Sequence, residues 1–246
     1  MTHEITVLSN GLRVVAVPMK ERRSVAIGLW VHVGGRHETL PLGGVSHFLE
    51  HVVFKGTKKR TTHQIKESIE GVGGSMNAFT GEEYTCFLAK IARRHFDEVF
   101  DVLSDMVLDA SITTTDVEKE RTVIMEEIKM TQDQPGQLAE EILSEIVWPD
   151  HPLGRPLAGT LETVAGLSRD DIVGYRDRYY QSNFITVVAA GDIDQKTLLK
   201  VSETRFKGGR TLYDNHTEFF KQNQKKPVVR MHSKSTEQTH LSLALH

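Results

Sequence analysis

The 246-residue sequence contains very little cysteine. Cys86 is the only one, so no disulfide can form within the chain, which fits a reducing compartment. It lies in the apolar run of residues 85–89, with nothing nearby that marks it as a nucleophile. We therefore expect a buried and unreactive thiol, and no chemistry based on cysteine.

The sequence also lacks a basic tail and long apolar runs. The net charge is -3, and the lysines and arginines are spread along the chain, so we expect no nucleic-acid partner. No apolar stretch approaches the length of a membrane span, and the first residues carry no leader pattern, so we expect no membrane partner. These features favour a globular protein of the cytoplasm.

Apolar spacing predicts an α+β fold. An Asn10-Gly11 turn predicts a hairpin over residues 5–17, and further strands are expected at 24–33, 75–80, 84–91 and 185–190. Helical spacing is found at 44–54, 62–71, 94–109, 115–131, 137–148, 168–179 and 195–206. We predict a mixed, mainly antiparallel sheet packed with helices.

A change of composition near the end predicts domain boundaries. Residues 208–227 are polar and contain two glycines, which is typical of a linker. Residues 228–232 and 240–245 are apolar again and predict two new strands. We therefore expect a first domain at 1–207, a linker at 208–227, and the start of an incomplete second domain at 228–246.

Three chemically active side chains share one face of the helix predicted at 44–54. His47, Glu50 and His51 lie close together on it because each residue of a helix advances about 100°. Two histidines four residues apart can bind one zinc ion, and a neighbouring carboxylate can take a proton from its water. The order His-x-x-Glu-His is the signature of the inverzincins. Helical histidine pairs also occur as surface or capped core residues, so a metal site needs a third ligand.

The helix predicted at 115–131 offers candidates for that ligand. With Ile124 at the centre of its apolar face, Glu120 and Glu127 lie on the buried side and Glu126 points away. Two carboxylates that face a core require a partner, and a metal would supply one. A salt-bridged helix edge explains them equally well, with one of three arginines as partner: Arg93, Arg94 or Arg121.

Several motifs together resemble one family. The run at residues 44–57 is followed by others at 74–80, 120–127, 151–154 and 183–192. In this order and spacing they resemble the pitrilysin-type zinc metallopeptidases, nearest to bacterial relatives of the mitochondrial processing peptidase beta subunit. The resemblance covers essentially the whole chain.

This resemblance implies a zinc-dependent endopeptidase that acts on peptides or unfolded protein segments. His47, His51 and Glu127 match the ligands of one zinc ion per chain, and Glu50 matches the general base. Glu120 matches a carboxylate that supports the site without binding the metal. An extended substrate is expected on an edge strand made of six residues: Ser75, Met76, Asn77, Ala78, Phe79 and Thr80.

The resemblance also implies a missing part. The family is similar to a duplication, in which two α/β halves enclose a chamber and the second half supplies an arginine and a tyrosine to the substrate. We therefore expect this chain to be one half, with a second homologous half or a partner subunit. The alternative is a non-catalytic or partner-dependent subunit, since relatives in respiratory complexes keep the fold without the site. The intact motif residues argue against a purely structural role.

Overall fold

A mixed sheet forms the centre of the computed structural model, which describes residues 3–208, 219–235 and 237–245. Within these residues the sheet has six strands in the order β1-β2-β6-β3-β5-β4. They are β1 (Glu4–Val7), β2 (Arg13–Pro18), β3 (Ser24–Val31), β4 (Ser75–Thr80), β5 (Thr85–Ala92) and β6 (Ile185–Gly191). Among these six described strands, β2 and β6 are the one pair of parallel neighbours. The predicted mixed, mainly antiparallel sheet is confirmed, and β4 lies at its edge.

The first hairpin forms where the sequence predicts it. β1 and β2 pair antiparallel around the Asn10-Gly11 turn, and Gly11 has a φ of 87°, which suits glycine. The side chain of Asn10 accepts a hydrogen bond from the amide of Leu12 at 3.1 Å. The turn is therefore fixed by residues that tolerate its backbone.

Helices cover one face of the sheet. The helices are α1 (Val45–Val52), α2 (Thr62–Ile69), α3 (Phe96–Asp109), α4 (Thr114–Asp133), α5 (Pro135–Val147), α6 (Leu161–Gly166), α7 (Arg169–Tyr179) and α8 (Gln195–Arg205). Alternate residues of β3 are buried, among them Ile27 and Leu29, and α3 and α8 pack against the sheet. Apolar spacing predicts each of these helices except α6, which is only six residues long.

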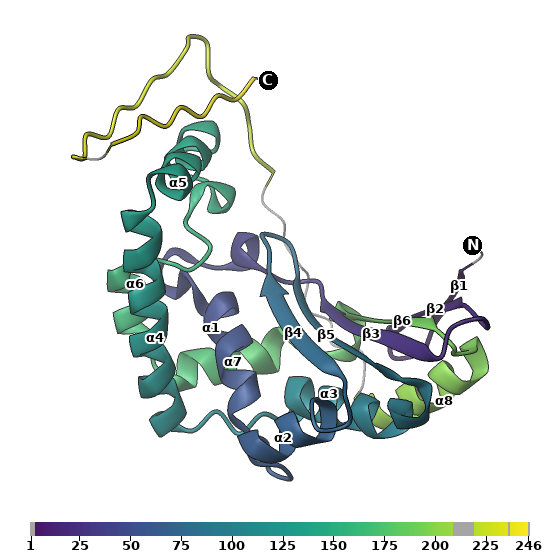
Figure 1. Cartoon of the computed structure of the whole chain (residues 1–246). Coiled ribbons are helices and arrows are strands. Elements are labelled where there is room, and N and C mark those ends of the chain that lie inside the picture. Colours follow the sequence, from purple (N-terminus) through teal and green to yellow (C-terminus); the bar gives the residue numbers. More distant parts are fainter. Residues whose placement is uncertain (1–2, 209–218, 236, 246) are drawn as a thin grey trace.

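The arrangement of α1, α4 and β4 creates the setting for a site. α1 lies beside the edge strand β4 on one side and α4 on the other (Figure 1). α4 begins after Thr113, whose hydroxyl accepts a hydrogen bond from the amide of Asp116 at 3.1 Å, as helix-capping residues do. Side chains from a short helix, a long helix and a sheet edge therefore meet in one region.

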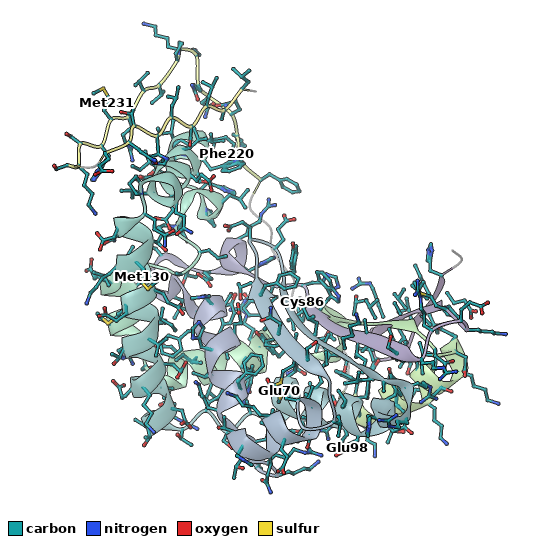
Figure 2. All side chains as sticks on the ribbon, viewed as in Figure 1. Glu70, Cys86, Glu98, Met130, Phe220 and Met231 are labelled. Carbon is teal, nitrogen blue, oxygen red and sulfur yellow. The ribbon has the colours of Figure 1, made fainter. Side chains whose placement is uncertain are left out.

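The two strands expected near the end of the chain are not formed in the described residues. Residues 219–235 and 237–245 carry no strand assignment and run as extended chain near α5 (Figure 1). Met231, labelled in Figure 2, is 90% exposed, and Leu241 is equally exposed. The prediction was wrong because alternating apolar residues form a strand only against a paired neighbour, and no described strand pairs with them. The proposed linker lies partly outside the described residues, and the domain boundaries stay a prediction.

No helix in the described part of the chain combines the length and the apolar character needed to cross a bilayer.

Asp105 of α3 joins three parts of the fold. Its carboxylate is fully buried and accepts hydrogen bonds from Thr57 Oγ1 at 2.6 Å, Arg60 Nη1 at 2.8 Å and Arg205 Nη2 at 2.9 Å. The first two residues belong to the loop that follows α1, and the third belongs to α8. This ion-pair cluster therefore holds the loop after α1 against the helical layer.

The Asp105→Asn variant is expected to lose about 1.5–3 kcal/mol of unfolding free energy at pH 7, the usual range for hydrogen bonds to charged groups, because Arg60 and Arg205 each lose one carboxylate partner. Both guanidinium groups are partly exposed and keep other acidic partners on α3, so the loss stays below that of an isolated buried ion pair. Chemical denaturation measures this loss. Glu98 is exposed on the same helix (Figure 2), so Glu98→Gln, as the control, should change stability by less than about 1 kcal/mol. Equal losses in both variants would contradict the assigned role.

The same cluster predicts a pH dependence. Burial opposes ionisation of Asp105, but hydrogen bonds from Thr57 and Arg60 outweigh it and lower the pKa of this carboxyl. The folded pKa is thus below the unfolded one, so the stabilisation is complete above about pH 4 and is lost as the pH falls through the folded value. Unfolding measured from pH 7 to pH 2 should show the parent losing more stability than Asp105→Asn.

Candidate metal centre

α1 carries the two histidines and the glutamate of the motif on its exposed side. Val45, Leu49 and Val52 are fully buried on its opposite side, which confirms the amphipathic pattern. The rings of His47 and His51 meet edge to face with centroids 4.7 Å apart. The helix thus anchors itself through its apolar side chains and presents both imidazoles in one direction.

Glu127 of α4 faces these imidazoles. Its Oε2 lies 3.9 Å from His47 Nε2 and 3.4 Å from His51 Nε2. One ligand atom from each of these three residues lies within 4.8 Å of the other two. Glu126 is turned away and pairs with Lys129 at 2.6 Å. The structure therefore brings together the three residues predicted as ligands and leaves Glu126 outside the group.

The environment of His47 favours its neutral form. Burial is the largest cause, and together with the neighbouring His51 it lowers the pKa of His47 to about 4, although Glu127 acts in the opposite direction. A histidine binds a metal through the lone pair of its neutral ring. His47 is therefore already in the protonation state that a metal requires at neutral pH.

Glu120 is the buried carboxylate beside this group. It is 6% exposed, with Oε2 at 3.2 Å from His51 Nδ1 and Oε1 at 2.7 Å from Lys55 Nζ. When His51 donates from Nδ1 to Glu120, its Nε2 lone pair is directed toward Glu127, which is how carboxylates commonly orient metal-binding histidines. The salt-bridged edge that the sequence left open is found at Glu120, but its partner is Lys55 and not an arginine. Arg121 pairs with Glu118 at 3.1 Å.

Glu50 lies on the same helix but faces β4. Its Oε2 accepts a hydrogen bond from Thr80 Oγ1 at 2.5 Å. This hydrogen bond ties the carboxylate of Glu50 to the last residue of the edge strand. Sequence reasoning named Thr80 only for the substrate surface, and the pairing of Thr80 with Glu50 was missed because it joins residues 30 positions apart.

The backbone of β4 alternates between its partner strand and the open edge. The amide of Gly81 donates to the carbonyl of Tyr84 at 2.7 Å, and antiparallel pairs alternate between hydrogen-bonded and non-hydrogen-bonded. Phe79 therefore exchanges hydrogen bonds with β5, whereas the polar groups of Ala78 point outward. Consistent with this, the amide of Ala78 donates to Asn77 Oδ1 at 2.9 Å. The six predicted substrate-binding residues form this strand, with a free edge toward the site.

The donor set fits a zinc ion. Two imidazole nitrogens and one carboxylate oxygen form a common three-ligand set for catalytic zinc. The pairing of His51 Nδ1 with Glu120 adds the supporting contact that such sites use. Sequence reasoning missed Lys55, whose only signal was its place four residues after the motif.

Comparison with known families gives two matches along the chain. The model described as insulinase (peptidase family M16) matches residues 13–161. The model described as the peptidase M16 inactive domain matches residues 166–246. The first match includes α1, α4 and β4. The second includes the described C-terminal segment.

Curated relatives are similar over most of this chain. An uncharacterized zinc protease of Streptomyces coelicolor is 36% identical over 246 residues, which cover 98% of this chain and 54% of the relative. Another from Bacillus subtilis is 40% identical over 194 residues, which cover 79% of this chain and 47% of that protein. The chain thus spans about half the length of these relatives.

Solved structures share the fold at low identity. A protease from Helicobacter pylori has a TM-score of 0.82 and 24% identity, over 89% of this chain and 53% of that one. Pitrilysin has a TM-score of 0.77 and 23% identity, over 87% of this chain and 24% of its own. The predicted fold class, an α+β unit that matches one part of longer chains, is therefore confirmed. By its family match and its similarity to named zinc proteases, the chain belongs to the M16 (insulinase) family of peptidases.

Proposed function

We propose that this chain is the metal-binding half of a zinc-dependent metalloendopeptidase that hydrolyses peptides or unfolded protein segments. The observation that supports this most strongly is the meeting of three ligand atoms, from His47, His51 and Glu127, within 4.8 Å of one another. Glu50 on the same helix supplies a carboxylate that belongs to none of these contacts. The proposed class also agrees with the names of the curated relatives.

Each residue has a distinct role in this proposal. His47, His51 and Glu127 hold one zinc ion, which when bound acts as a Lewis acid and lowers the pKa of water. Glu50 accepts a proton from the attacking water and later transfers it to the leaving amine of the peptide. Thr80 holds the carboxylate of Glu50 through its hydroxyl. Glu120 acts through His51 and is a positioning residue.

The substrate in this proposal binds as an added strand along β4. Main-chain hydrogen bonds to a sheet edge give affinity with little demand on side chains, so selectivity comes from a few pockets. The outward groups of Ala78 and Thr80 lie at the end of the strand where Thr80 contacts Glu50. A peptide paired there would pass in front of the proposed base.

Proline substitutions on β4 test this substrate surface. The Ala78→Pro variant removes an outward amide and is tolerated at a sheet edge, so we expect peptide affinity to fall roughly two- to tenfold, the effect of one hydrogen bond. Fluorescence anisotropy with a labelled peptide, in a Glu50→Gln background to prevent cleavage, measures it. Phe79→Pro instead removes an amide that pairs with β5 and should lower the melting temperature. Unchanged peptide affinity in a folded Ala78→Pro chain would exclude binding along this edge.

Full activity in this proposal depends on a second half. The chain spans about half of its curated relatives, and we propose that a homologous half or a partner subunit completes the substrate chamber. The finer relationship to bacterial relatives of the mitochondrial processing peptidase beta subunit is part of the same proposal. We therefore prefer a catalytic subunit that depends on a partner over an enzyme that is active alone.

Peptide hydrolysis with and without the second half tests the proposed function. The 246-residue chain with zinc is expected to cleave a quenched fluorescent peptide at least about 100-fold more slowly than the chain with a separately produced second half, because misplaced substrate groups cost rates of that order. A chelator should abolish both rates. Equal rates would show that the chain is self-sufficient. Absence of cleavage in the completed protein would overturn the assignment as a peptidase.

A further inference from the structure

The start of α1 lacks a capping side chain of its own. The residue before the helix is Gly44, with a φ of 91° and no side chain to accept a hydrogen bond. The first four amides of any helix have no partner within the helix. His47 lies in this first turn, so the way in which the turn is fixed bears directly on the position of its imidazole.

Glu38 supplies the missing cap from six positions upstream. Its Oε2 accepts a hydrogen bond from the amide of Gly44 at 2.7 Å, and its Oε1 accepts one from the amide of Ser46 at 2.8 Å. The residue is only 6% exposed. A carboxylate that accepts from two amides at a helix N-terminus gains both charge-assisted hydrogen bonds and the favourable end of the helix dipole.

Glu38 and the start of α1 are themselves held in place. Arg155 Nη1 donates to the carbonyl of Glu38 at 2.9 Å, and the hydroxyls of Ser46 and Tyr175 lie 3.1 Å apart. On the other side, a Cβ at Gly44 would lie 2.5 Å from the carbonyl oxygen of Ala158. The first turn therefore sits between a buried carboxylate and a close backbone, with little room to shift.

The burial of Glu38 is unfavourable in itself. Burial raises the pKa of its carboxyl to about 7, although the amides of Ser46 and Gly44 act against that shift. A buried acid needs hydrogen-bond donors in place of water, and the amides of Gly44 and Ser46 supply them. With only eight residues, α1 is in turn too short to hold its shape without such contacts.

We propose that Glu38 is a positioning residue, which fixes the first turn of α1 so that His47 meets His51 and Glu127 in the geometry that binds zinc. This inference rests on the proposed zinc site. Glu38 lies outside the motif, and in this proposal it affects metal affinity through the backbone of α1. Its carboxylate accepts hydrogen bonds from the amides of Gly44 and Ser46, and neither of these residues is a proposed ligand or part of β4.

The Glu38→Gln variant of the 246-residue chain tests the proposal. A glutamine can accept from one amide, but its NH₂ group then faces the other. We expect zinc affinity, measured by competition with a chromogenic chelator, to fall at least about tenfold. This is the usual effect of removing a residue that orients a metal ligand without binding the metal. In the metal-free chain, NMR hydrogen exchange at the amides of Gly44 and Ser46 should become faster.

A control separates positioning from general loss of stability. Asp194 caps α8 through the amide of Thr197 at 2.8 Å, so Asp194→Ala should lower stability by about 1 kcal/mol and leave zinc affinity unchanged. The Glu38→Asp variant keeps the charge but is too short to reach both amides, and it gives the same test if Glu38→Gln does not fold. We expect weaker zinc binding there as well.

The outcomes are distinct. Zinc affinity equal to that of the parent in a folded Glu38→Gln or Glu38→Asp chain would overturn the positioning role. An equal loss of affinity in Asp194→Ala would also overturn it, because instability alone would then explain the effect. A parent chain that binds no zinc would instead refute the proposed function on which this inference depends.

Discussion

Replacing Glu50 by glutamine is expected to leave zinc binding near the parent level and to lower kcat/KM for peptide hydrolysis by about 10²- to 10⁴-fold, the usual contribution of a general base. Glutamine has the same size but cannot accept a proton. Glu50 is absent from the group of three ligand atoms, and its carboxylate is bound by Thr80. The measurement is peptide cleavage by the completed protein, with zinc content determined on the same samples.

Two results would contradict this role of Glu50. Cleavage at near the parent rate would show that another group takes the proton. Loss of zinc together with activity would show that Glu50 acts as a ligand. A Thr80→Val variant provides a graded comparison, because it removes only the hydroxyl that holds the base and should reduce the rate by less than Glu50→Gln does.

Removing any one of the three proposed ligands is expected to weaken zinc binding by more than about 100-fold. A residue that only orients a ligand costs up to about that much when it is removed, and a ligand itself should cost more. The variants are His47→Ala, His51→Ala and Glu127→Gln. Glu126→Gln is the matched control, because Glu126 neighbours Glu127 on α4 but pairs with Lys129 outside the site. It should bind zinc like the parent. Equilibrium competition with a chelator at constant pH measures all four affinities.

A reversed pattern at positions 126 and 127 would contradict the assignment of Glu127. Zinc lost from Glu126→Gln and retained by Glu127→Gln would mean that α4 turns differently when metal is bound. Circular dichroism of each variant verifies that the helices remain. A variant that keeps its helices and loses zinc has lost a ligand and not its fold.

Helical periodicity narrowed the choice of site residues, and the resemblance to a known family selected among those that periodicity left. A residue advance of about 100° placed His47 and His51 on one face and distinguished Glu127 from Glu126, and the structure has the same arrangement. The hairpin at Asn10-Gly11 was equally predictable, because its turn depends on local backbone preferences. These features are encoded within a few neighbouring residues.

Features that depend on distant contacts could not be predicted. Lys55 reaches Glu120 and Glu38 reaches the first turn of α1, and neither contact leaves a periodic pattern. The strands expected at 228–232 and 240–245 failed for a related reason, since a strand needs a pairing partner that local sequence does not specify. The domain boundaries and the cytoplasmic location stay predictions.

The most direct test of the central claim is the zinc content of the purified 246-residue chain after dialysis against zinc and removal of the free ion. The account predicts about one zinc ion per chain, and an X-ray absorption spectrum with two imidazole nitrogens and carboxylate oxygen around the metal. His47→Ala should lose that zinc. A chain with no bound zinc, or one whose zinc remains fully bound in His47→Ala, would contradict the claim that His47, His51 and Glu127 form a metal centre.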